Sequence, residues 1–433
     1  MFNTIDINGL GRGRSTDNKI SLLVARIVEN MDVISDKNYI YIKDGLYYKQ
    51  IEKQTFLREF ITLFNRVVNL PDYEGSLWRP KYGENAWKHL QALCYRENID
   101  TYPNLIPFKN GVFNIKSNIF SPSFTELLVY HFPFNYNPTP NPIEFKRVIK
   151  EIIPNNEDRE FFLTFMNYAF TGDINNQLAL ILLGSGNNGK TKLMEFFIKL
   201  MGPRATTTKI NKLTDDSVRC NLKGKTLCYS SEIGGHYMNQ DLMETIKETI
   251  TEVNKSGRKP YMQLEEWINT TKFICATNNL PQLQMFEKAF LRRFKIIEFP
   301  IDFTGREDRT LFDRLYELEG GDILSWILQE FNDWSILTVD WKETESLWRY
   351  KSDAVKRFIE EECDIDYGYR ISTNIIYDAY VKYCIKDDEA PLSQRYFTRR
   401  MTKLGYNPIR DIDGAWKFEG IVLKKDLLVT VEV

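Results

Sequence analysis

Eight residues between positions 184 and 191 have the types and spacing of a phosphate-binding loop. The segment Gly184-Ser-Gly-Asn-Asn-Gly-Lys-Thr191 matches G-x-x-x-x-G-K-[ST] in full, between an apolar run, Leu178–Leu183, and a helical pattern, Lys192–Met201. In such a loop backbone N–H groups surround phosphate oxygens, the lysine reaches the β and γ oxygens, and the hydroxyl holds Mg²⁺. This context disfavours a chance match in a glycine-rich loop. The predicted cofactors are ATP and Mg²⁺, and the predicted nucleotide-binding residues are Gly184, Ser185, Gly186, Asn187, Asn188, Gly189, Lys190, Thr191 and Lys192.

Two further apolar segments end in polar residues that suit the same chemistry. A P-loop needs an acidic partner on a neighbouring strand to complete the metal site and polarise water. The strand expected at 226–229 is followed by Ser231 and Glu232, so we predict Thr191, Ser231 and Glu232 around the metal. Asn278 ends the next expected strand, where an amide can sense the γ-phosphate. The alternatives are a surface carboxylate at Glu232 and an ordinary turn at Asn278.

A pair of arginines precedes the last expected strand of this region. Arg292 and Arg293 stand where an arginine finger could reach the nucleotide of a neighbouring subunit, although a solvated basic pair fits the same pattern. The predicted hydrolytic residues are Lys190, Glu232, Asn278 and Arg293.

An α/β sheet is expected to position these residues. Apolar segments of buried-strand type alternate with helical patterns, at Leu178–Leu183, Thr226–Tyr229, Lys272–Ala276 and Lys295–Phe299. Such alternation predicts a parallel sheet whose ligands bind at the carboxyl ends of the strands. The fold class is therefore α/β, with a P-loop ATPase core.

The flanking segments have different patterns. Asp44-Gly45 and Asn110-Gly111 predict hairpins in an α+β N-terminal domain. After Gln394–Leu404, the last of three expected helices, a terminal hairpin completes the pattern of a winged helix. The predicted division is an N-terminal domain at 1–137, a helical linker or collar at 138–175, the ATPase at 176–335 and the winged helix at 336–433.

Charge and composition limit the partners. The net charge is 57 − 59 = −2, so any contact with DNA must come from local basic patches. One such patch is Arg395, Arg399 and Lys403, which share a helical face in the expected winged helix. A protein-contact module is the alternative there. Six scattered cysteines and three histidines disfavour a zinc site, and no apolar run could span a bilayer. We expect a soluble cytoplasmic protein that has no membrane partner.

The order of these motifs resembles superfamily 3 helicases, and within them the phage, plasmid and poxvirus-type primase–helicase family. The resemblance rests on the P-loop, a strand ending in Ser231-Glu232, Ala276-Thr-Asn-Asn-x-Pro281, and then Arg292-Arg293-Phe294. Upstream, Phe108–Val112 is similar to an Asn-Gly turn of that family. The resemblance implies an AAA+-like ATPase core. It also places Lys247, Arg258 and Lys259 at a hairpin facing a DNA channel, although Thr251-Glu252-Val253 replaces the family's Gly-Gly-Asp.

The resemblance implies a DNA helicase that forms a hexameric ring and acts in replication of a phage, plasmid or other mobile element. The expected partners are single-stranded and forked DNA, other copies of the chain, and a separate primase or origin-binding protein. The expected location is the cytoplasm of a bacterial host or a poxvirus-like viral setting. The first 150 residues contain no Asp-x-Asp pair, so no primase domain is expected. A DNA-packaging translocase and an origin-binding initiator that uses ATP only to assemble are the competing interpretations.

Overall fold

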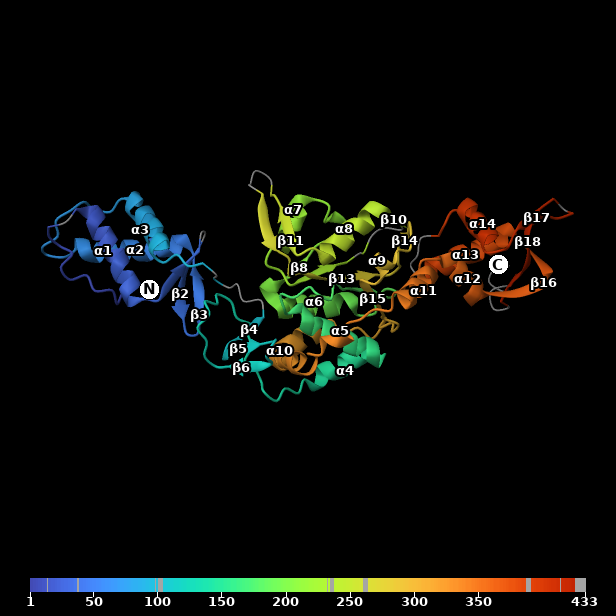
Figure 1. Cartoon of the computed structure of the whole chain (residues 1–433), viewed down its shortest axis with the longest axis horizontal. Helices are drawn as coiled ribbons and strands as arrows, with labels where there is room; N and C mark the ends of the chain where they lie inside the picture. The colour runs from blue at the N-terminus through green and yellow to red at the C-terminus, as the bar shows by residue number, and fades with distance from the viewer. Residues whose placement is uncertain are drawn as a thin grey trace. The chain divides into compact units, whose positions relative to one another are not determined.

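The computed structural model describes residues 1–13, 15–36, 39–97, 99, 104–231, 233, 237–259, 264–386, 391–412 and 414–424. The chain forms two compact units, Met1–Pro138 and Thr139–Val433, and each is described by itself (Figure 1).

The first unit combines helices with two small antiparallel sheets. Its helices are α1 (Thr16–Asn30), α2 (Lys53–Val68) and α3 (Pro80–Leu93). The sheets have the orders β1-β2-β3 and β4-β5-β6, with strands β1 (Val33–Ser35), β2 (Ile40–Asp44), β3 (Tyr47–Ile51), β4 (Leu105–Phe108), β5 (Gly111–Asn114) and β6 (Ile119–Ser121). Both predicted hairpins are present, and Gly45 has the positive φ of +66° that a tight turn favours.

The second unit contains a five-stranded parallel sheet. Its strand order is β15-β7-β13-β9-β8, and every neighbouring pair is parallel. The strands are β7 (Ala179–Leu183), β8 (Ala205–Thr207), β9 (Leu227–Ser230), β13 (Lys272–Thr277) and β15 (Phe294–Glu298). Four of them lie within about two residues of the predicted strands, because fully buried parallel strands read as continuous apolar runs. The short strand β8 was not predicted.

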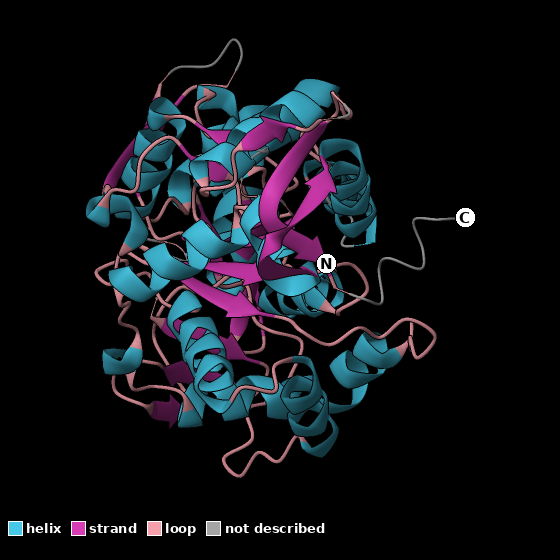
Figure 2. Cartoon of the chain, turned by 90° about the vertical axis from the view of Figure 1, so that its right-hand side faces the viewer, coloured by secondary structure: helices cyan, strands magenta, loops and turns pink. Residues whose placement is uncertain are grey.

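Helices cover both faces of this sheet (Figures 1 and 2). On one face, alternate residues of β7 and β13 pack in one hydrophobic core with Ile246 of α8, Phe290 of α9 and Trp348 of α11. Aromatic contacts join the helices α4, α5, α6 and α10. Phe162 of α5 contacts Phe197 of α6, and Phe145 of α4 contacts Trp326 of α10. The helices are α4 (Ile143–Ile152), α5 (Asn156–Ala169), α6 (Lys190–Met201), α8 (Gln240–Thr251), α9 (Lys288–Leu291), α10 (Leu311–Glu330) and α11 (Trp341–Lys351).

Short elements connect the strands of the sheet. They are the helix α7 (Asp216–Arg219), the 3-10 helices at 202–204, 210–212 and 220–222, the parallel pair β10 (Tyr237–Met238) and β14 (Gln282–Leu283), and the antiparallel pair β11 (Asn254–Gly257) and β12 (Glu265–Ile268). A further 3-10 helix, at 334–336, lies between α10 and α11. None of the helices in the described ranges is long and apolar enough to cross a membrane.

The last part of the second unit has its own core. The helices are α12 (Ala354–Glu362), α13 (Thr373–Lys386) and α14 (Gln394–Lys403), packed on the antiparallel sheet β16-β18-β17 with β16 (Cys363–Ser372), β17 (Pro408–Arg410) and β18 (Trp416–Leu423). Strand β16 was not predicted, because seven of its ten residues are exposed and leave no apolar alternation in the sequence. That this arrangement is a winged helix stays a prediction.

Candidate nucleotide-binding site

The predicted P-loop joins the end of β7 to the start of α6 and folds into a compact turn. Asn188 shapes it from within, because its Nδ2 donates to the carbonyl oxygens of Ser185 at 2.5 Å and Phe299 at 3.3 Å. A Cβ on Gly184 would lie 2.5 Å from the Phe299 carbonyl oxygen, so that position must be glycine. Gly189 has a φ of +82° and ends the loop. The loop therefore depends on its glycines at two of three positions, since Gly186 faces open space.

Lys190 turns its side chain back into the loop. Its Nζ donates to the carbonyl oxygens of Gly184 at 2.6 Å and Ser185 at 3.0 Å, and to Oδ1 of Asn188 at 2.9 Å. The residue is only 5% exposed, and this burial lowers the pKa of Lys190 to about 8. These partners are all neutral oxygens, and a phosphate would stabilise the charge of the ammonium much better.

The Asn278 side chain lies next to the Lys190 ammonium. It follows β13, the strand next to β7 in the sheet, and its Oδ1 is 3.5 Å from Lys190 Nζ. The structure therefore brings together two residues that the sequence analysis assigned to one site from separate motifs. The carboxyl ends of parallel strands share one edge of a sheet, which explains why the segments that follow β7 and β13 bring Lys190 and Asn278 close together.

The metal side of the site is described only in part. Thr191 is exposed at the start of α6, and Ser231 is exposed just beyond β9. Glu232 lies outside the described residues. Tyr229 of β9 was not among the residues selected from the sequence, and burial raises the pKa of its hydroxyl. Lys192 carries its side chain to the surface, where it pairs with Glu195 at 2.7 Å.

The residues of the loop fit a bound phosphate. Gly189 is the N-cap residue of α6 and has no side chain to cap it, and in the first turn the Lys190 N–H donates to Asn188 Oδ1 at 3.5 Å. The backbone N–H groups of a helix N-terminus suit an anion. A pocket of about 420 Å³ opens beside the loop. Its lining includes Gly184, Ser185, Asn278 and Arg357. The site thus offers both a phosphate cradle and room for a ligand.

The two arginines before β15 differ in exposure. Arg293 is 7% exposed, and its guanidinium donates to the carbonyl oxygen of Ala289. Burial, and then the charge of Arg292, lower the pKa of Arg293. Arg292 itself is exposed. The backbone of Arg293 pairs with Ala179 at the start of β7, the sheet edge opposite the P-loop. Neither arginine can therefore contact the nucleotide of its own P-loop. The arginine finger at Arg293 stays a prediction, and Arg292 is the more exposed candidate for that role.

The predicted basic hairpin is present between β9 and β13. Arg258 and Lys259 are exposed and follow β11 directly, where the chain leaves the β11–β12 pair. Lys247 lies on α8, the helix that leads into the hairpin, and is half-buried. The change from Gly-Gly-Asp does not prevent the hairpin, because Lys255 Nζ donates to the Glu248 carbonyl oxygen and pairs with Glu252 at 2.8 Å.

The predicted basic face of α14 is also exposed. Arg395, Arg399 and Lys403 lie on the outer side of the helix, opposite the buried Phe397 and Met401. Within the described ranges these three cations form no ion pair, whereas Arg400 of the same helix pairs with Asp353. The face is therefore available to a polyanion.

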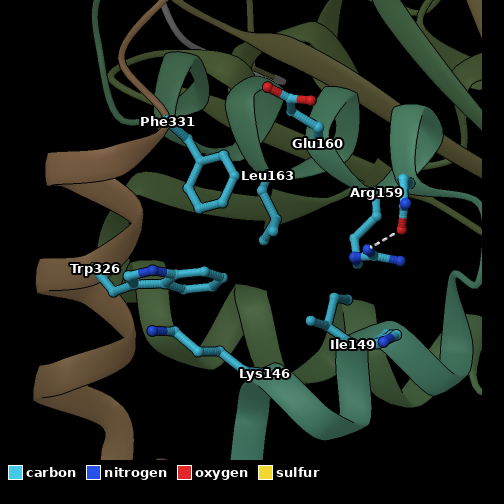
Figure 3. Close-up of a pocket in the computed structure, with 9 residues that line it drawn as sticks. Lys146, Ile149, Arg159, Glu160, Leu163, Trp326 and Phe331 are labelled. Carbon is cyan, nitrogen blue, oxygen red and sulfur yellow. Dashed lines mark hydrogen bonds between the residues drawn. The ribbon is translucent and has the colours of Figure 1, made fainter. Parts of the chain in front are cut away.

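A second pocket, of about 330 Å³, lies between α4, α5 and α10 (Figure 3). Trp326 and Phe331 supply aromatic walls, and Lys146 Nζ lies 4.9 Å from the centre of the Trp326 ring. Arg159 comes from the facing helix α5. None of its lining residues was selected from the sequence.

Two protein-family models match separate parts of the chain. Residues 182–293 match a family of unknown function, DUF5906, and residues 84–154 match a family described as D5 N terminal like. The first match spans the sequence from the P-loop to Arg293.

Curated relatives come from two viruses. The chain is 25% identical over 267 residues to "Putative helicase L207/L206" of Acanthamoeba polyphaga mimivirus, covering 57% of this chain and 27% of that protein. It is 23% identical over 270 residues to "Putative helicase 121R" of Invertebrate iridescent virus 3, covering 58% and 28%. The chain thus spans about a quarter of the length of the curated relatives it matches.

Among solved structures, the apo C-terminal region of NrS-1 has a similar fold. The TM-score is 0.50 at 11% identity, over 93% of this chain and 100% of that one. This similarity shows a shared fold. The D5 family match and the two viral relatives named as putative helicases support the resemblance to the phage and viral primase–helicase family. Membership of superfamily 3 is a finer assignment that stays a prediction.

Proposed function

We propose that this chain, a relative of the phage and viral primase–helicases, is an ATP-dependent DNA helicase of superfamily 3 that acts in replication. The observation that carries the proposal is the convergence of Lys190 and Asn278 at the carboxyl edge of a parallel sheet, 3.5 Å apart at the N-terminus of α6. This is the geometry in which a P-loop binds a nucleoside triphosphate.

Each residue of the site has a distinct task in the proposal. Lys190 exchanges its contacts with loop carbonyls for the β and γ oxygens, and Asn278 holds the ammonium in place and senses the γ-phosphate. Thr191, with Ser231 and Glu232, holds the metal, and Glu232 orients the attacking water. Bound Mg²⁺ supplies charge neutralisation at the phosphates being separated.

The DNA side of the proposal rests on exposed cations. Arg258 and Lys259 at the β11–β12 hairpin contact the phosphates of a single strand, and the α14 face contacts duplex. A hexameric ring would place Arg292 or Arg293 against the nucleotide of the next subunit. The partners proposed are forked DNA, further copies of the chain, and a separate primase or origin-binding protein, in the cytoplasm of an infected host.

Strand displacement on a forked duplex tests this function. We expect displacement with ATP and Mg²⁺, and none with a non-hydrolysable ATP analogue. Hydrolysis without displacement on any fork, together with tight binding of duplex, would replace the helicase by an initiator that uses ATP to assemble. Translocation along duplex without strand separation would indicate a packaging-type motor. Images of particles with and without ATP and DNA would give the size of the ring.

A further inference from the structure

The pocket beside the P-loop is bordered by cations from a distant part of the chain. Lys351, the last residue of α11, and Arg357 of α12 line the pocket together with Gly184, Ser185 and Asn278. The carboxylate among its lining residues is that of Glu298, which lies 2.6 Å from Lys351 Nζ. Positive charge therefore exceeds negative charge around the pocket, which suits an anionic ligand.

Helix α11 is fixed to the loop after β13 and to the start of β15. Trp348, one turn before Lys351, is fully buried, and its Nε1 donates to the Pro281 carbonyl oxygen at 2.8 Å. Pro281 belongs to the loop that begins with Asn278. Thr344 donates its hydroxyl to the Phe294 carbonyl oxygen of β15 at 3.2 Å. Because of these contacts, the end of α11 keeps Lys351 at a defined place relative to Asn278.

The turn after α11 leads directly to the exposed basic helix. Asp353 caps α12 by accepting from the Lys356 backbone N–H at 3.2 Å, and it also accepts from Arg400 Nε of α14 at 2.9 Å. Arg357 donates to the carbonyl oxygens of Tyr350 and Lys351, and so it holds the turn from the other side. The turn at 351–353 thus contacts the nucleotide pocket with one residue and α14 with another.

We propose that Lys351 is a second phosphate-binding cation of the nucleotide site, and that the turn at 351–353 couples this site to duplex binding by α14. The inference rests on the proposed function, because its ligand is the nucleoside triphosphate of the P-loop. The γ-phosphate competes with Glu298 for the Lys351 ammonium and fixes the turn. A fixed turn holds α14 in one orientation through Asp353 and Arg400. Duplex binding then costs less conformational entropy, because α14 is already ordered. The nucleotide therefore raises the affinity for duplex, and duplex raises the affinity for the nucleotide by the same factor.

Equilibrium binding of AMP-PNP, ADP and a short DNA duplex to the full-length chain tests the proposal. Coupling of the usual size would make AMP-PNP and duplex each tighten the other's binding by about fivefold or more. In Lys351→Met the dissociation constant for AMP-PNP should rise by about tenfold or more, the usual worth of a hydrogen bond from a charged group, while that for ADP changes little. In Glu298→Gln, which releases Lys351 from its ion pair, AMP-PNP should bind more tightly than to wild type.

Asp353→Asn tests the coupling step. Asparagine is as good an N-cap as aspartate, so the variant keeps α12 but loses the charge opposite Arg400. The mutual strengthening of AMP-PNP and duplex should then fall to a factor of about 1. Lys356→Gln is the matched control, because Lys356 is an exposed cation on the same helix, paired with Glu360 and outside this pocket. It should show the wild-type factor.

The outcomes separate this inference from the proposed function. Wild-type chain that fails to bind AMP-PNP would overturn both. Wild-type chain that binds AMP-PNP and duplex independently, or Asp353→Asn with the coupling intact, would overturn the coupling alone. Equal affinities of wild type and Lys351→Met for AMP-PNP would remove Lys351 from the site. If Lys351→Met does not fold, as judged by thermal unfolding, the Glu298→Gln measurement decides, and unchanged affinity there would count against the proposal.

Discussion

The ammonium of Lys190 lies 3.5 Å from Oδ1 of Asn278, 88 residues further along the chain. Both residues follow the carboxyl ends of adjacent strands, β7 and β13, which pair in parallel with Leu183 opposite Thr277. The strands are buried and hydrogen-bonded over five residue pairs, and the P-loop oxygens of Gly184, Ser185 and Asn188 hold Lys190 Nζ beside the strand ends. Asn278 is therefore placed to detect any displacement of the Lys190 side chain.

Replacing Lys190 by methionine should abolish nucleotide hydrolysis. Methionine keeps most of the side-chain volume, so the loop should stay packed while the charge at the β and γ oxygens is lost. We expect turnover to fall on the order of 10²–10³-fold, the usual effect of removing one preorganised charge-stabilising group. Phosphate release measures it, with Lys199→Met as the control, because Lys199 is on the same helix but pairs with Asp313 on the surface. Turnover near that of wild type in Lys190→Met would refute the P-loop assignment.

The lowered pKa of Lys190 predicts a pH dependence of nucleotide affinity. With a pKa of about 8 in the free protein, the ammonium loses its proton as the pH rises above 8, and a neutral amine binds phosphate weakly. The dissociation constant for ATP should therefore rise above pH 8, by up to about tenfold per pH unit. Lys190→Arg should remove this rise, because a guanidinium stays charged. Fluorescent-nucleotide titrations between pH 7 and 9.5 measure both profiles.

Unfolding would not explain that loss of affinity. The pKa of Lys190 is lower in the folded chain than its ordinary value of 10.5, so between these two pH values the unfolded chain binds more protons at this residue. The contribution of Lys190 to the free energy of unfolding consequently rises with pH in this window. Parallel pH profiles in wild type and Lys190→Arg would show that another group titrates.

The sequence predicted the elements around the P-loop well, because their patterns are local. The P-loop is continuous in the chain, and its flanking strand and helix have unmistakable apolar patterns. The strands that present Ser231 and Asn278 are buried on both faces, so their positions could also be read from the sequence.

The residues that were missed lie far from any motif. Lys351 reaches the pocket because Trp348 anchors α11 in the core of the sheet, whereas the predicted boundary at 335/336 placed α11 in the C-terminal module. The hairpin at Arg258 was in doubt because a family turn is absent, yet the buried Lys255 supports it through contacts to α8. Long-range contacts of this kind leave no periodic pattern in the sequence, so they could not be predicted from it.

The unequal burial of the two arginines predicts different defects. Arg293→Ala should lower the free energy of unfolding by about 1–3 kcal/mol, because the side chain is buried and bonded to Ala289. Arg292→Ala should change stability by less than about 0.5 kcal/mol. If Arg292 is the finger, it should also lower hydrolysis by about 10³-fold or more.

Mixing of inactive variants tests the finger directly. Arg292→Ala subunits keep an intact P-loop, and Lys190→Met subunits keep an intact finger, so hybrid interfaces should regain hydrolysis. Thermal unfolding and phosphate release at several mixing ratios measure the two effects. Recovery with Arg293→Ala but not with Arg292→Ala, once subunit exchange is verified, would return the role to Arg293.

The hairpin cations predict a defect that appears only with DNA. Arg258→Ala/Lys259→Ala should hydrolyse ATP at the wild-type rate without DNA, since neither side chain has a role at the phosphates in the proposed site. It should lose the stimulation by single-stranded DNA and the displacement of a forked strand, because the grip on phosphates is gone. Lys49→Ala/Arg58→Ala, which removes two exposed cations of the first unit, is the control. A hairpin variant that unwinds at the wild-type rate would place the grip elsewhere.

The exposed face of α14 predicts how duplex binding depends on salt. Removing one cation that touches a phosphate reduces the slope of log K against log salt concentration by about 0.9, so Arg395→Gln/Arg399→Gln/Lys403→Gln should lower the slope by up to about 2.7. Affinity at low salt should fall most, because released counterions contribute most there.

The control neutralises three cations of the same module that are paired with carboxylates, Lys356, Arg370 and Lys417. Fluorescence anisotropy with a short duplex at several salt concentrations measures all three proteins. If both triple variants change the slope equally, the field of the whole module acts and α14 does not contact the phosphates. If neither changes it, the module binds a protein instead of DNA.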